Sequence, residues 1–465
     1  MNDLVMELDS HSSRHLYEQI YDYIKMEIRE GKLLQGEKLP STRFLAEYLQ
    51  VSRSTVDLAY EQLLSEGYIE SRPYKGFFVC KIEELYRLEQ PKNQREETQE
   101  KAPERFAYDF SPNSVELNSF PFGTWKKINK ETLIDDKKEM FALGQPQGDL
   151  ELRKTICHYL HTSRGVNCKP EQLIIGAGND YLLLLLEKIL GRHRSVAMEQ
   201  LTYKRAYRIF ESFAYEVKAV PMDENGMRVD ALRKSGAELA YVMPARQSPT
   251  GIIMPIGRRM ELLKWAAEDE KRYLIEDDYD SEFRYRGKPI PSLQASDKAG
   301  KVIYIGTFSK SIAPAIRVSY MVLPESLLEI YKEQCSFFSS TVSRIDQSIL
   351  NVFIRDGAFE RHLNKMRKIY KNRHDTLLSA CKKYLKNVEI SGENAGLHLI
   401  LHYQGKKTEK ELLQAAAEKG IRIYGMSEAY IGRLPDDWQP TLILGYAGLS
   451  EKEIEEGIRL LSECI

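Results

Sequence analysis

Residues 303–320 read IYIGTFSKSIAPAIRVSY, an apolar strand-like run followed by a polar turn that contains one lysine. Hydroxyl groups at Thr307 and Ser309, together with Arg317, could hold a phosphate near Lys310, because a guanidinium group bonds phosphate through two parallel donors. A lysine that takes part in chemistry needs a lowered pKa or a carbonyl partner for a Schiff base. Read alone, the stretch fits a cofactor-binding lysine, but an exposed lysine in a polar turn is the simpler interpretation.

The sequence on either side of this turn predicts the surrounding fold. From residue 108 to residue 465, short apolar runs alternate with longer amphipathic segments; the runs are LIIGAG, LAYVMP, RYLIED, KVIYIGT and SYMVLP. This alternation predicts an α/β domain with a mostly parallel sheet. Sites in such sheets open at the carboxyl ends of the strands, and Asp277, Tyr279 and Tyr203 all follow predicted strand ends.

Pyridoxal phosphate (PLP) carries both an aldehyde for a lysine and a phosphate, and it needs a carboxylate against its ring nitrogen. Asp277 is the candidate for the ring nitrogen and Tyr279 for the ring hydroxyl. Tyr203 could stack on the ring, with a packing aromatic as the equal alternative. Gly178 and Asn179 follow LIIGAG, where backbone N–H groups at a helix N-terminus could reach the phosphate. Taken alone, these small residues are more typical of an ordinary strand-to-helix turn.

The first eighty residues have a different pattern. An apolar stripe recurs every four residues from Leu16 to Ile28; two short helices capped by Ser41 and Ser52 follow, and then a hairpin. A helix–turn–helix with a wing places the start of its second helix in the major groove. The predicted DNA contacts are Ser52, Arg53, Ser54 and Thr55 in that helix, Arg43 in the helix before it, and Lys75 and Gly76 at the hairpin turn.

Charge argues against DNA binding by bulk electrostatics. Residues 1–80 hold nine Lys and Arg against thirteen Asp and Glu, a balance of minus four. A DNA-binding surface that ignores sequence is basic. Binding through this segment therefore has to be local and helped by dimerisation, and the alternative is a helical protein-interaction module.

The rest of the composition limits the class of protein. The chain has 465 residues, a length that favours two or three domains. Its net charge is −1, so the chain has no global excess of positive charge. Its six cysteines form no C-x-x-C pair, so we expect no metal site and a reducing cytoplasm. The most apolar stretch, residues 181–190, is too short to span a bilayer. Residues 81–107 are polar, Gly-free and contain two prolines, which predicts a linker, with a solvated helix as the alternative.

Residues 1–80 resemble the winged helix of the GntR family. The matching residues are Leu39-Pro40-Ser41-x-Arg43, Val51-Ser52-Arg53-x-Thr55-Val56 and Leu64-x-x-Glu66-Gly67-Tyr68. Residues 108–465 resemble a fold-type I aminotransferase, and the whole chain resembles the MocR/GabR branch of GntR regulators. Four motifs carry this second resemblance: LGQPQGDLELR (143–153), PARQSPTG (244–251), IEDDYDSEFRY (275–285) and GTFSKSIAPAIR (306–317).

The resemblance implies roles for single residues. Lys310 is the lysine that forms the Schiff base with PLP, Asp277 and Tyr279 bind the ring nitrogen and hydroxyl, and Tyr203 stacks on the ring. Arg205 matches an arginine that meets the effector carboxylate in some members. Arginines matching Arg43 and Arg53, and residues of the wing, contact DNA. The family also implies a homodimer with shared sites, and its two-fold symmetry implies two half-sites on double-stranded DNA.

Two departures separate this chain from working aminotransferases. Ser248 stands where they have the asparagine that bonds the ring hydroxyl, and TLILGYAGLS (441–450) lacks their substrate-binding arginine. GabR-like members have an arginine where this chain has Glu428, which repels a carboxylate and favours an amine. We therefore expect a PLP-dependent transcriptional regulator that senses an amine, an amino acid or PLP itself, with little or no transamination. The alternatives are an active aminotransferase with an accessory DNA-binding domain, and a DNA-binding protein whose body holds no cofactor.

Overall fold

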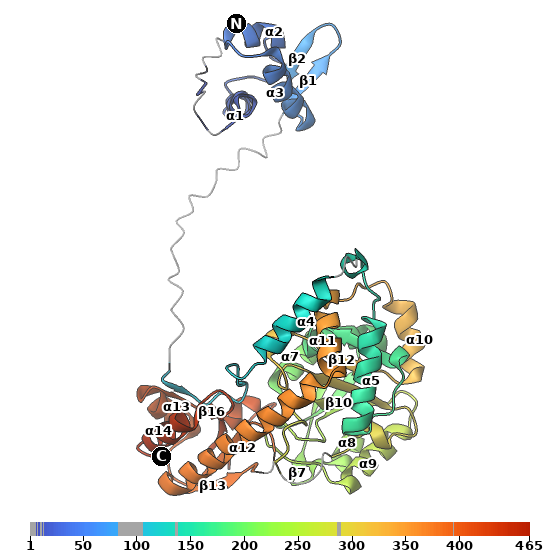
Figure 1. Ribbon diagram of the computed structural model, residues 1–465, viewed down its shortest axis with the longest axis vertical. Helices are drawn as coiled ribbons and strands as arrows, with labels where there is room; N and C mark the ends of the chain where they lie inside the picture. Colours follow the sequence, from blue (N-terminus) through green and yellow to red (C-terminus); the bar gives the residue numbers. More distant parts are fainter. Residues whose placement is uncertain are drawn as a thin grey trace. The chain divides into compact units, whose positions relative to one another are not determined.

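The structure, a computed structural model, describes residues 6, 8, 9, 12, 14–81, 106–134, 138–285, 290–393 and 395–465. The chain divides into two compact units, Met1–Pro103 and Glu104–Ile465 (Figure 1). Nearly all of the predicted linker, residues 82–105, lies outside the described residues.

The N-terminal unit is a helix–turn–helix followed by a hairpin, as predicted. Three helices pack around one core to which Ile20, Tyr60 and Leu63 each contribute a fully buried side chain. Ser41 and Ser52 accept hydrogen bonds from the backbone of Phe44 and Thr55 and so begin the second and third helices. The elements are α1 (Leu16–Arg29), α2 (Thr42–Tyr48), α3 (Arg53–Ser65) and the antiparallel pair β1 (Ile69–Arg72) and β2 (Gly76–Val79).

A seven-stranded sheet in the order β4-β12-β11-β10-β9-β5-β6 forms the centre of the larger unit. Its strands are β4 (Leu173–Gly176), β5 (Ser195–Glu199), β6 (Glu216–Val220), β9 (Leu239–Val242), β10 (Tyr273–Asp278), β11 (Val302–Thr307) and β12 (Ser319–Val322). The pairs among β6, β5, β9, β10 and β11 are parallel, and β12 runs antiparallel to both of its neighbours. The predicted mostly parallel α/β sheet is confirmed, with one reversed strand.

Helices cover this sheet on both faces, which is why its strands read as continuous apolar runs. All six residues of β10 and of β11 are buried. Along β11, Ile303 and Ile305 join the core on one face, and Tyr304 joins the core on the other. The helices are α4 (Phe122–Ile134), α5 (Leu150–Arg164), α6 (Asn179–Leu190), α7 (Lys204–Ser212), α8 (Val229–Ser235), α9 (Ile256–Ala267), α10 (Glu325–Gln334), α11 (Arg344–Arg355) and α12 (Ala358–Tyr384).

The chain ends in a smaller layer that the sequence patterns did not predict. After the 27-residue α12, an antiparallel sheet of order β13-β14-β17-β16 packs with two helices (Figure 1). We call this the C-terminal sheet. Its elements are β13 (Val388–Ser391), β14 (His398–Tyr403), α13 (Glu409–Glu418), β16 (Tyr424–Gly425), β17 (Thr441–Gly445) and α14 (Glu451–Leu461), and the short β3 (Tyr108–Asp109) pairs beside it with β15 (Ile421–Arg422).

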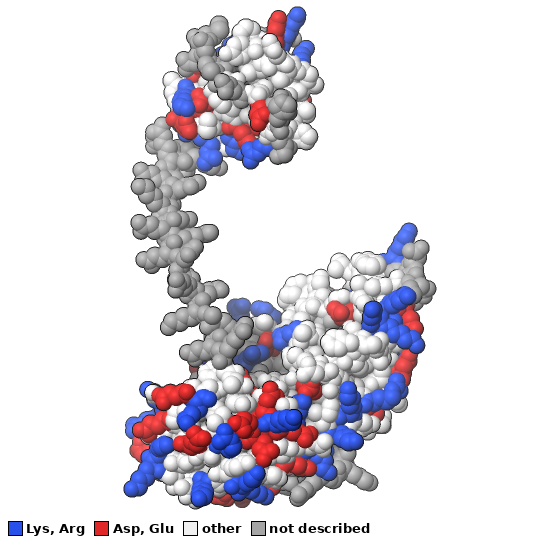
Figure 2. Space-filling view, turned by 60° about the vertical axis from the view of Figure 1, so that its left-hand side comes forward, with Lys and Arg blue, Asp and Glu red and all other residues white. Residues whose placement is uncertain are grey.

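Two further observations concern the surface charge of the larger unit and the length and polarity of the helices. Acidic and basic side chains lie close together over the lower part of the larger unit in Figure 2, so charges of both signs are mixed there. Among the described residues, every helix is too short or too polar to traverse a lipid bilayer.

Candidate functional site

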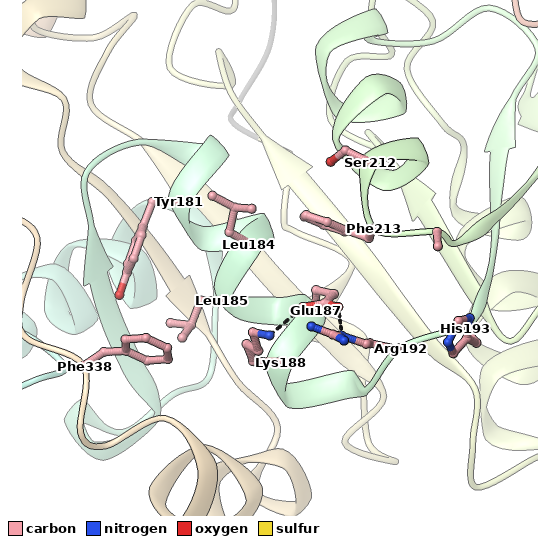
Figure 3. Close-up of a pocket in the computed structure, with 11 residues that line it drawn as sticks. Tyr181, Leu184, Leu185, Glu187, Lys188, Arg192, His193, Ser212, Phe213 and Phe338 are labelled. Atoms are coloured by element: carbon pink, nitrogen blue, oxygen red, sulfur yellow. Dashed lines mark hydrogen bonds and ion pairs between the residues drawn. The ribbon is translucent and has the colours of Figure 1, made fainter. Parts of the chain in front are cut away.

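A cavity of about 540 Å³ beside α6 lacks the predicted chemistry. Figure 3 shows its apolar walls, which include Tyr181, Phe213 and Phe338. The charged groups at this cavity pair with one another, since Glu187 makes ion pairs with both Lys188 and Arg192. None of the residues predicted to bind the cofactor lines the cavity.

The predicted residues come together at the carboxyl ends of β10 and β11. The parallel pairing of these strands sets Asp277 opposite Ile305 and Asp278 opposite Gly306. The residues that follow, Tyr279 on one strand and Thr307 to Lys310 on the other, therefore emerge at the same edge of the sheet. This adjacency joins two motifs that lie about thirty residues apart in the sequence.

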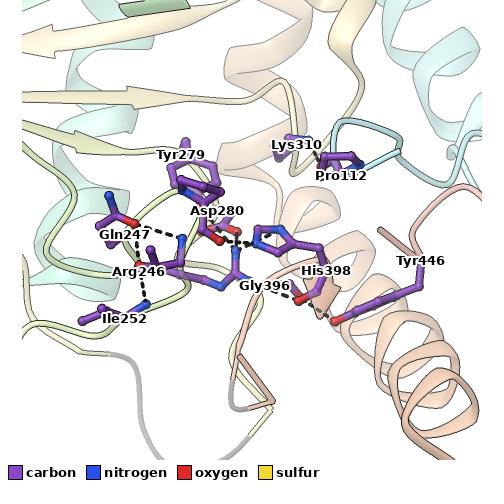
Figure 4. Close-up of polar contacts among 12 residues, drawn as sticks. Pro112, Arg246, Gln247, Ile252, Tyr279, Asp280, Lys310, Gly396, His398 and Tyr446 are labelled. Carbon is purple, nitrogen blue, oxygen red and sulfur yellow. Dashed lines mark hydrogen bonds and ion pairs between the residues drawn. The ribbon is translucent and has the colours of Figure 1, made fainter. Parts of the chain in front are cut away.

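Lys310 is half-buried at this edge, where its Nζ donates a hydrogen bond to the carbonyl oxygen of Pro112 at 3.0 Å (Figure 4). Burial lowers the pKa of Lys310 to about 8, the carboxylate of Asp280 opposes this change, and the guanidinium of Arg246 adds to it. A lysine with such a pKa is partly uncharged near neutral pH, so its nitrogen is available for bonding to a carbonyl carbon.

Asp277 is a buried carboxylate held by two donors. The hydroxyl of Tyr241 donates to its Oδ2, and Asn179 Nδ2 donates to its Oδ1 at 3.2 Å. Burial raises the pKa of Asp277 to about 7, although both donors act to lower it. The side chain of Asn179 thus supports the carboxylate, in addition to the backbone role expected at the helix N-terminus. Tyr241 was missed because, within LAYVMP, it reads as a core residue of a strand.

The residues predicted to hold the phosphate come from three elements. Gly178 begins α6 with φ 94° and ψ 165°, and a Cβ there would lie 2.4 Å from Nη2 of Arg317. Arg317 donates to the carbonyl oxygen of Ala177 at 3.1 Å and pairs with Asp180 at 3.3 Å. Beside them, the hydroxyl of Thr307 donates to that of Ser309 at 3.0 Å. The turn, the guanidinium and the hydroxyls are the donor types that bind phosphate.

The ring-hydroxyl side contains Tyr279, which is held from the loop between β9 and α9. Arg246 Nη1 donates to the hydroxyl oxygen of Tyr279 at 3.2 Å, and the Ser248 side chain also bonds this hydroxyl. Burial raises the pKa of Tyr279, so the hydroxyl keeps its proton. Ser248 therefore lies beside the Tyr279 hydroxyl, and Arg246 is an additional residue there that the sequence patterns did not single out.

The remaining predicted residues are Tyr203, Arg205 and Glu428. Tyr203 begins α7, and burial raises the pKa of its hydroxyl. The charge of Arg205 lowers this pKa, and that of Asp277 raises it. Arg205 pairs with Asp180 at 3.7 Å, so Arg205 and Arg317 share one carboxylate. Glu428 lies in a short 3-10 helix, η6 (Met426–Ala429), with its side chain exposed and with no ion pair among the described residues.

These residues fit PLP by the types of group that they supply. A partly uncharged lysine, a buried carboxylate and a phosphate-binding helix terminus match the aldehyde, the ring nitrogen and the phosphate of that cofactor. Gly178 has no room for a side chain, which fits a turn where the backbone closely approaches a ligand. The buried Oδ1 of Asn179 also has no hydrogen-bond partner among the described residues, so it can accept a further donor.

The candidate DNA contacts lie on the N-terminal unit. The Ser52 hydroxyl accepts from the backbone of Thr55 at 3.2 Å and lies within 2.8 Å of the hydroxyls of Ser54 and Thr55, so it serves the helix cap. Arg53 is exposed and makes an ion pair with Asp57 at 3.5 Å, which is weak at a solvated surface. Arg43 is also exposed, and Lys75 and Gly76 lie at the wing turn, where Gly76 has φ 101°.

Comparison with known proteins gives two family matches. Residues 111–461 match the aminotransferase class I and II family, and residues 16–79 match the bacterial regulatory proteins of the gntR family. The chain is 41% identical over 447 residues to the uncharacterized HTH-type transcriptional regulator YdeL of Bacillus subtilis, covering 96% of each chain. It is 32% identical to the probable rhizopine catabolism regulatory protein MocR of Rhizobium meliloti, covering 98% of this chain and 95% of the relative.

A solved structure resembles the larger unit. The multiple substrate aminotransferase of Thermococcus profundus superposes with a TM-score of 0.69 at 26% sequence identity. The match covers 83% of this chain and 97% of that enzyme. Regulator-like relatives thus match nearly the full chain, and an aminotransferase matches mainly its body.

Proposed function

Since the chain belongs to the MocR/GabR branch of the GntR family of transcriptional regulators, we propose that its PLP site is a sensor for a small amine. The chain is a DNA-binding regulator fused to an aminotransferase-like body, and PLP is the cofactor of that body. In the proposed function, an effector that reaches the site changes how the winged helices of a homodimer meet two half-sites of promoter DNA. The DNA-binding domain spans residues 1–80, the linker 81–107 and the sensing domain 108–465, and the protein works in the cytoplasm.

The pairing of the arginines at the site carries the proposal for an amine. Arg246 forms a buried ion pair with Asp280, and Arg205 and Arg317 share Asp180. Two cations with one carboxylate leave a positive charge suited to phosphate, and the Arg246 pair leaves none. A guanidinium group is the side chain best suited to hold the carboxylate of an amino-acid effector. Arg205, Arg246 and Arg317 are all already engaged with carboxylates, whereas an amine needs no guanidinium group.

When bound, PLP would supply an aldehyde that can bond an amine. Lys310 would provide that amine, and Asp277 would hold a proton at the ring nitrogen. Tyr279 and Ser248 would bond the ring hydroxyl, and Tyr203 would lie against the ring. The backbone of Gly178 and Asn179, the hydroxyls of Thr307 and Ser309, and the guanidinium of Arg317 would hold the phosphate.

A displaced Lys310 has an acceptor within reach. Its Nζ lies 3.0 Å from the carbonyl oxygen of Pro112. Pro112 follows β3 near the beginning of the larger unit, where the chain arrives from the linker. The bonding state of Lys310 therefore acts on a segment close to the linker. Coupling of this kind requires the effector to favour one arrangement of the dimer over another.

The test uses the full chain loaded with PLP. Small primary amines and amino acids are added in turn, and the visible absorption band and the affinity for operator DNA are both measured. We expect amines to change the band and the DNA affinity together, and Lys310→Ala to remove the band and the response. An amine that changes the band but leaves DNA binding unaltered would overturn the sensor proposal. A stronger response to amino acids than to amines would overturn the proposal that the effector is an amine.

An active aminotransferase is the second candidate, because Lys310, Asp277 and Tyr279 form a complete cofactor set. An assay with an amino donor and a 2-oxo acid separates the two. We expect at most a few turnovers, since Arg205, Arg246 and Arg317 are all paired with carboxylates. Sustained turnover would favour the enzyme.

A further inference from the structure

Arg246 is a buried arginine on the Tyr279 side of the cofactor site, in the loop between β9 and α9 (Figure 4). Its Nη1 donates to the Tyr279 hydroxyl at 3.2 Å and to Asp280 Oδ2 at 3.1 Å. The side chains of Arg246 and Asp280 are only 2% and 3% exposed. A buried ion pair of this kind is weak evidence for stability, because desolvation offsets the attraction. A role in the site therefore explains the pair better than a contribution to stability does.

The same guanidinium group also contacts the C-terminal sheet. Arg246 Nη2 donates to the carbonyl oxygen of His398, the first residue of β14, at 3.3 Å. Of the two ring nitrogens of His398, Nε2 lies 2.9 Å from the carbonyl oxygen of Pro249 and therefore carries the proton. His398 Nδ1 is then an acceptor that faces Arg246 Nη1 at 3.5 Å. Burial and the nearby charge of Arg246 keep the pKa of His398 well below its usual value, so the ring is neutral.

Gly396 completes the slot that holds the guanidinium group. A Cβ at this residue would lie 2.0 Å from Cζ of Arg246, so the arginine fits only against a glycine. The carbonyl oxygen of Gly396 accepts a hydrogen bond from the Tyr285 hydroxyl at 2.7 Å and a second from Tyr446. The strand connection that carries Gly396 is therefore held in place on its other side.

We propose that Arg246 is a positioning residue that fixes the Tyr279 hydroxyl and links the cofactor site to the C-terminal sheet. This inference rests on the proposed sensor function and adds a route into it. The planar fork of an arginine donates in several directions at once, whereas a lysine is a point charge. The C-terminal sheet also leads into η6, whose Ala429 carbonyl accepts from the backbone of Thr202, next to Tyr203. A shift of the C-terminal sheet on effector binding would thus reach Arg246 through His398 and Tyr203 through Thr202.

Charges around Lys310 support this position for Arg246. The groups that act on Lys310 are the carboxylate of Asp280, which raises its pKa, and the guanidinium of Arg246, which lowers it. His398 is neutral, and the Tyr279 hydroxyl keeps its proton. Removal of Arg246 therefore leaves Lys310 beside an unpaired carboxylate, which favours the charged form of the lysine.

The test measures the pH midpoint of the visible absorption band in the PLP-loaded full chain, without effector or DNA. We expect Arg246→Gln to raise the midpoint by about one pH unit, the change that one neighbouring charge produces. Arg246→Lys keeps the charge and should restore most of the midpoint. His398→Ala removes one contact of Arg246 on the sheet side, and it should move the midpoint in the same direction by a smaller amount.

Arg259 provides the matched control. It is equally buried, but among the described residues its hydrogen bonds go to the carbonyl oxygens of Met254, Pro244 and Pro291. Arg259→Gln should lower the melting temperature and leave the midpoint unchanged. Equal shifts in Arg246→Gln and Arg259→Gln would reduce Arg246 to a packing residue. A shift in Arg246→Gln without one in His398→Ala would overturn the part of the link that passes through the His398 ring.

A variant that fails to retain PLP is tested in a second way. The pH dependence of covalent labelling of Lys310 is measured in the cofactor-free chain, and Arg246→Gln should require a higher pH for labelling. An unchanged labelling profile would overturn the positioning role. These measurements need no effector, so their outcome does not depend on whether the sensor proposal holds.

Discussion

Gly178 gives the sharpest test of the phosphate end of the site. It is the N-cap of α6, and Gly191 is the C-cap of the same helix. Their backbone angles are nearly equal, φ 94° and ψ 165° against φ 86° and ψ 166°. A Cβ at Gly178 would lie 2.4 Å from Nη2 and 2.7 Å from Cζ of Arg317, whereas a Cβ at Gly191 meets nothing within 4 Å. The two glycines thus share a backbone conformation and differ in what an added side chain would meet.

The expected magnitudes follow from that comparison. Both Gly178→Ala and Gly191→Ala place a side chain in a backbone region that only glycine adopts freely, at a cost of about 1–3 kcal/mol each. Gly178→Ala additionally displaces Arg317. The loss of one hydrogen bond to a charged group costs about 1.5–3 kcal/mol. At 1.4 kcal/mol for each tenfold change, PLP should bind about 10 to 100 times more weakly to Gly178→Ala.

The assay is an equilibrium titration of cofactor-free full-length protein with PLP, followed by visible absorbance, with thermal denaturation in parallel. We expect similar losses of melting temperature in the two glycine variants, and weaker PLP binding in Gly178→Ala alone. Arg317→Ala should match Gly178→Ala in PLP affinity. Equal PLP affinities in Gly178→Ala and Gly191→Ala would refute the placement of the phosphate against Arg317.

Three further predictions concern other parts of the chain. Arg53→Ala should weaken specific operator binding by about 1–3 kcal/mol in a gel-shift assay, and unchanged affinity would remove Arg53 from the base-reading residues. Asp280→Asn should lower the pH at which Lys310 is labelled in the cofactor-free chain, because the Asp280 carboxylate raises the pKa of Lys310, which is about 8; a higher labelling pH would contradict this. Leu63→Ala should destabilise the winged helix by about 2–5 kcal/mol, because Leu63 is fully buried, and calorimetry should show the loss in that unit while PLP binding stays unchanged.

Local patterns predicted the elements that depend on neighbouring residues. The four-residue spacing of Ile20, Ile24 and Ile28 predicts α1, and all three side chains are buried. Ser41 and Ser52 were predicted as helix caps, and both accept the expected backbone hydrogen bonds. Caps and apolar stripes act within one or two helical turns, so the sequence contains all that they require.

Other parts of the fold depend on contacts between distant segments. The C-terminal sheet pairs β14 with β17, about forty residues further along the chain, and no local period announces that pairing. The reversed direction of β12 is likewise set by its place between β11 and β4. Strand order and direction come from packing over the whole sheet, which short apolar runs leave open.

The sequence by itself determined the kinds of group at the cofactor site: a lysine between serines, a carboxylate after a strand, and an arginine one turn beyond. It could do so because each group belongs to a short motif whose chemistry can be read in place. The tertiary structure decided which partners control those groups. Tyr241 and Arg246 lie in β9 and in the loop after it, and His398 lies about 150 residues further along the chain. Only the folded sheet brings Tyr241 against Asp277 and Arg246 between Tyr279 and His398, because burial and hydrogen bonding depend on neighbours in space.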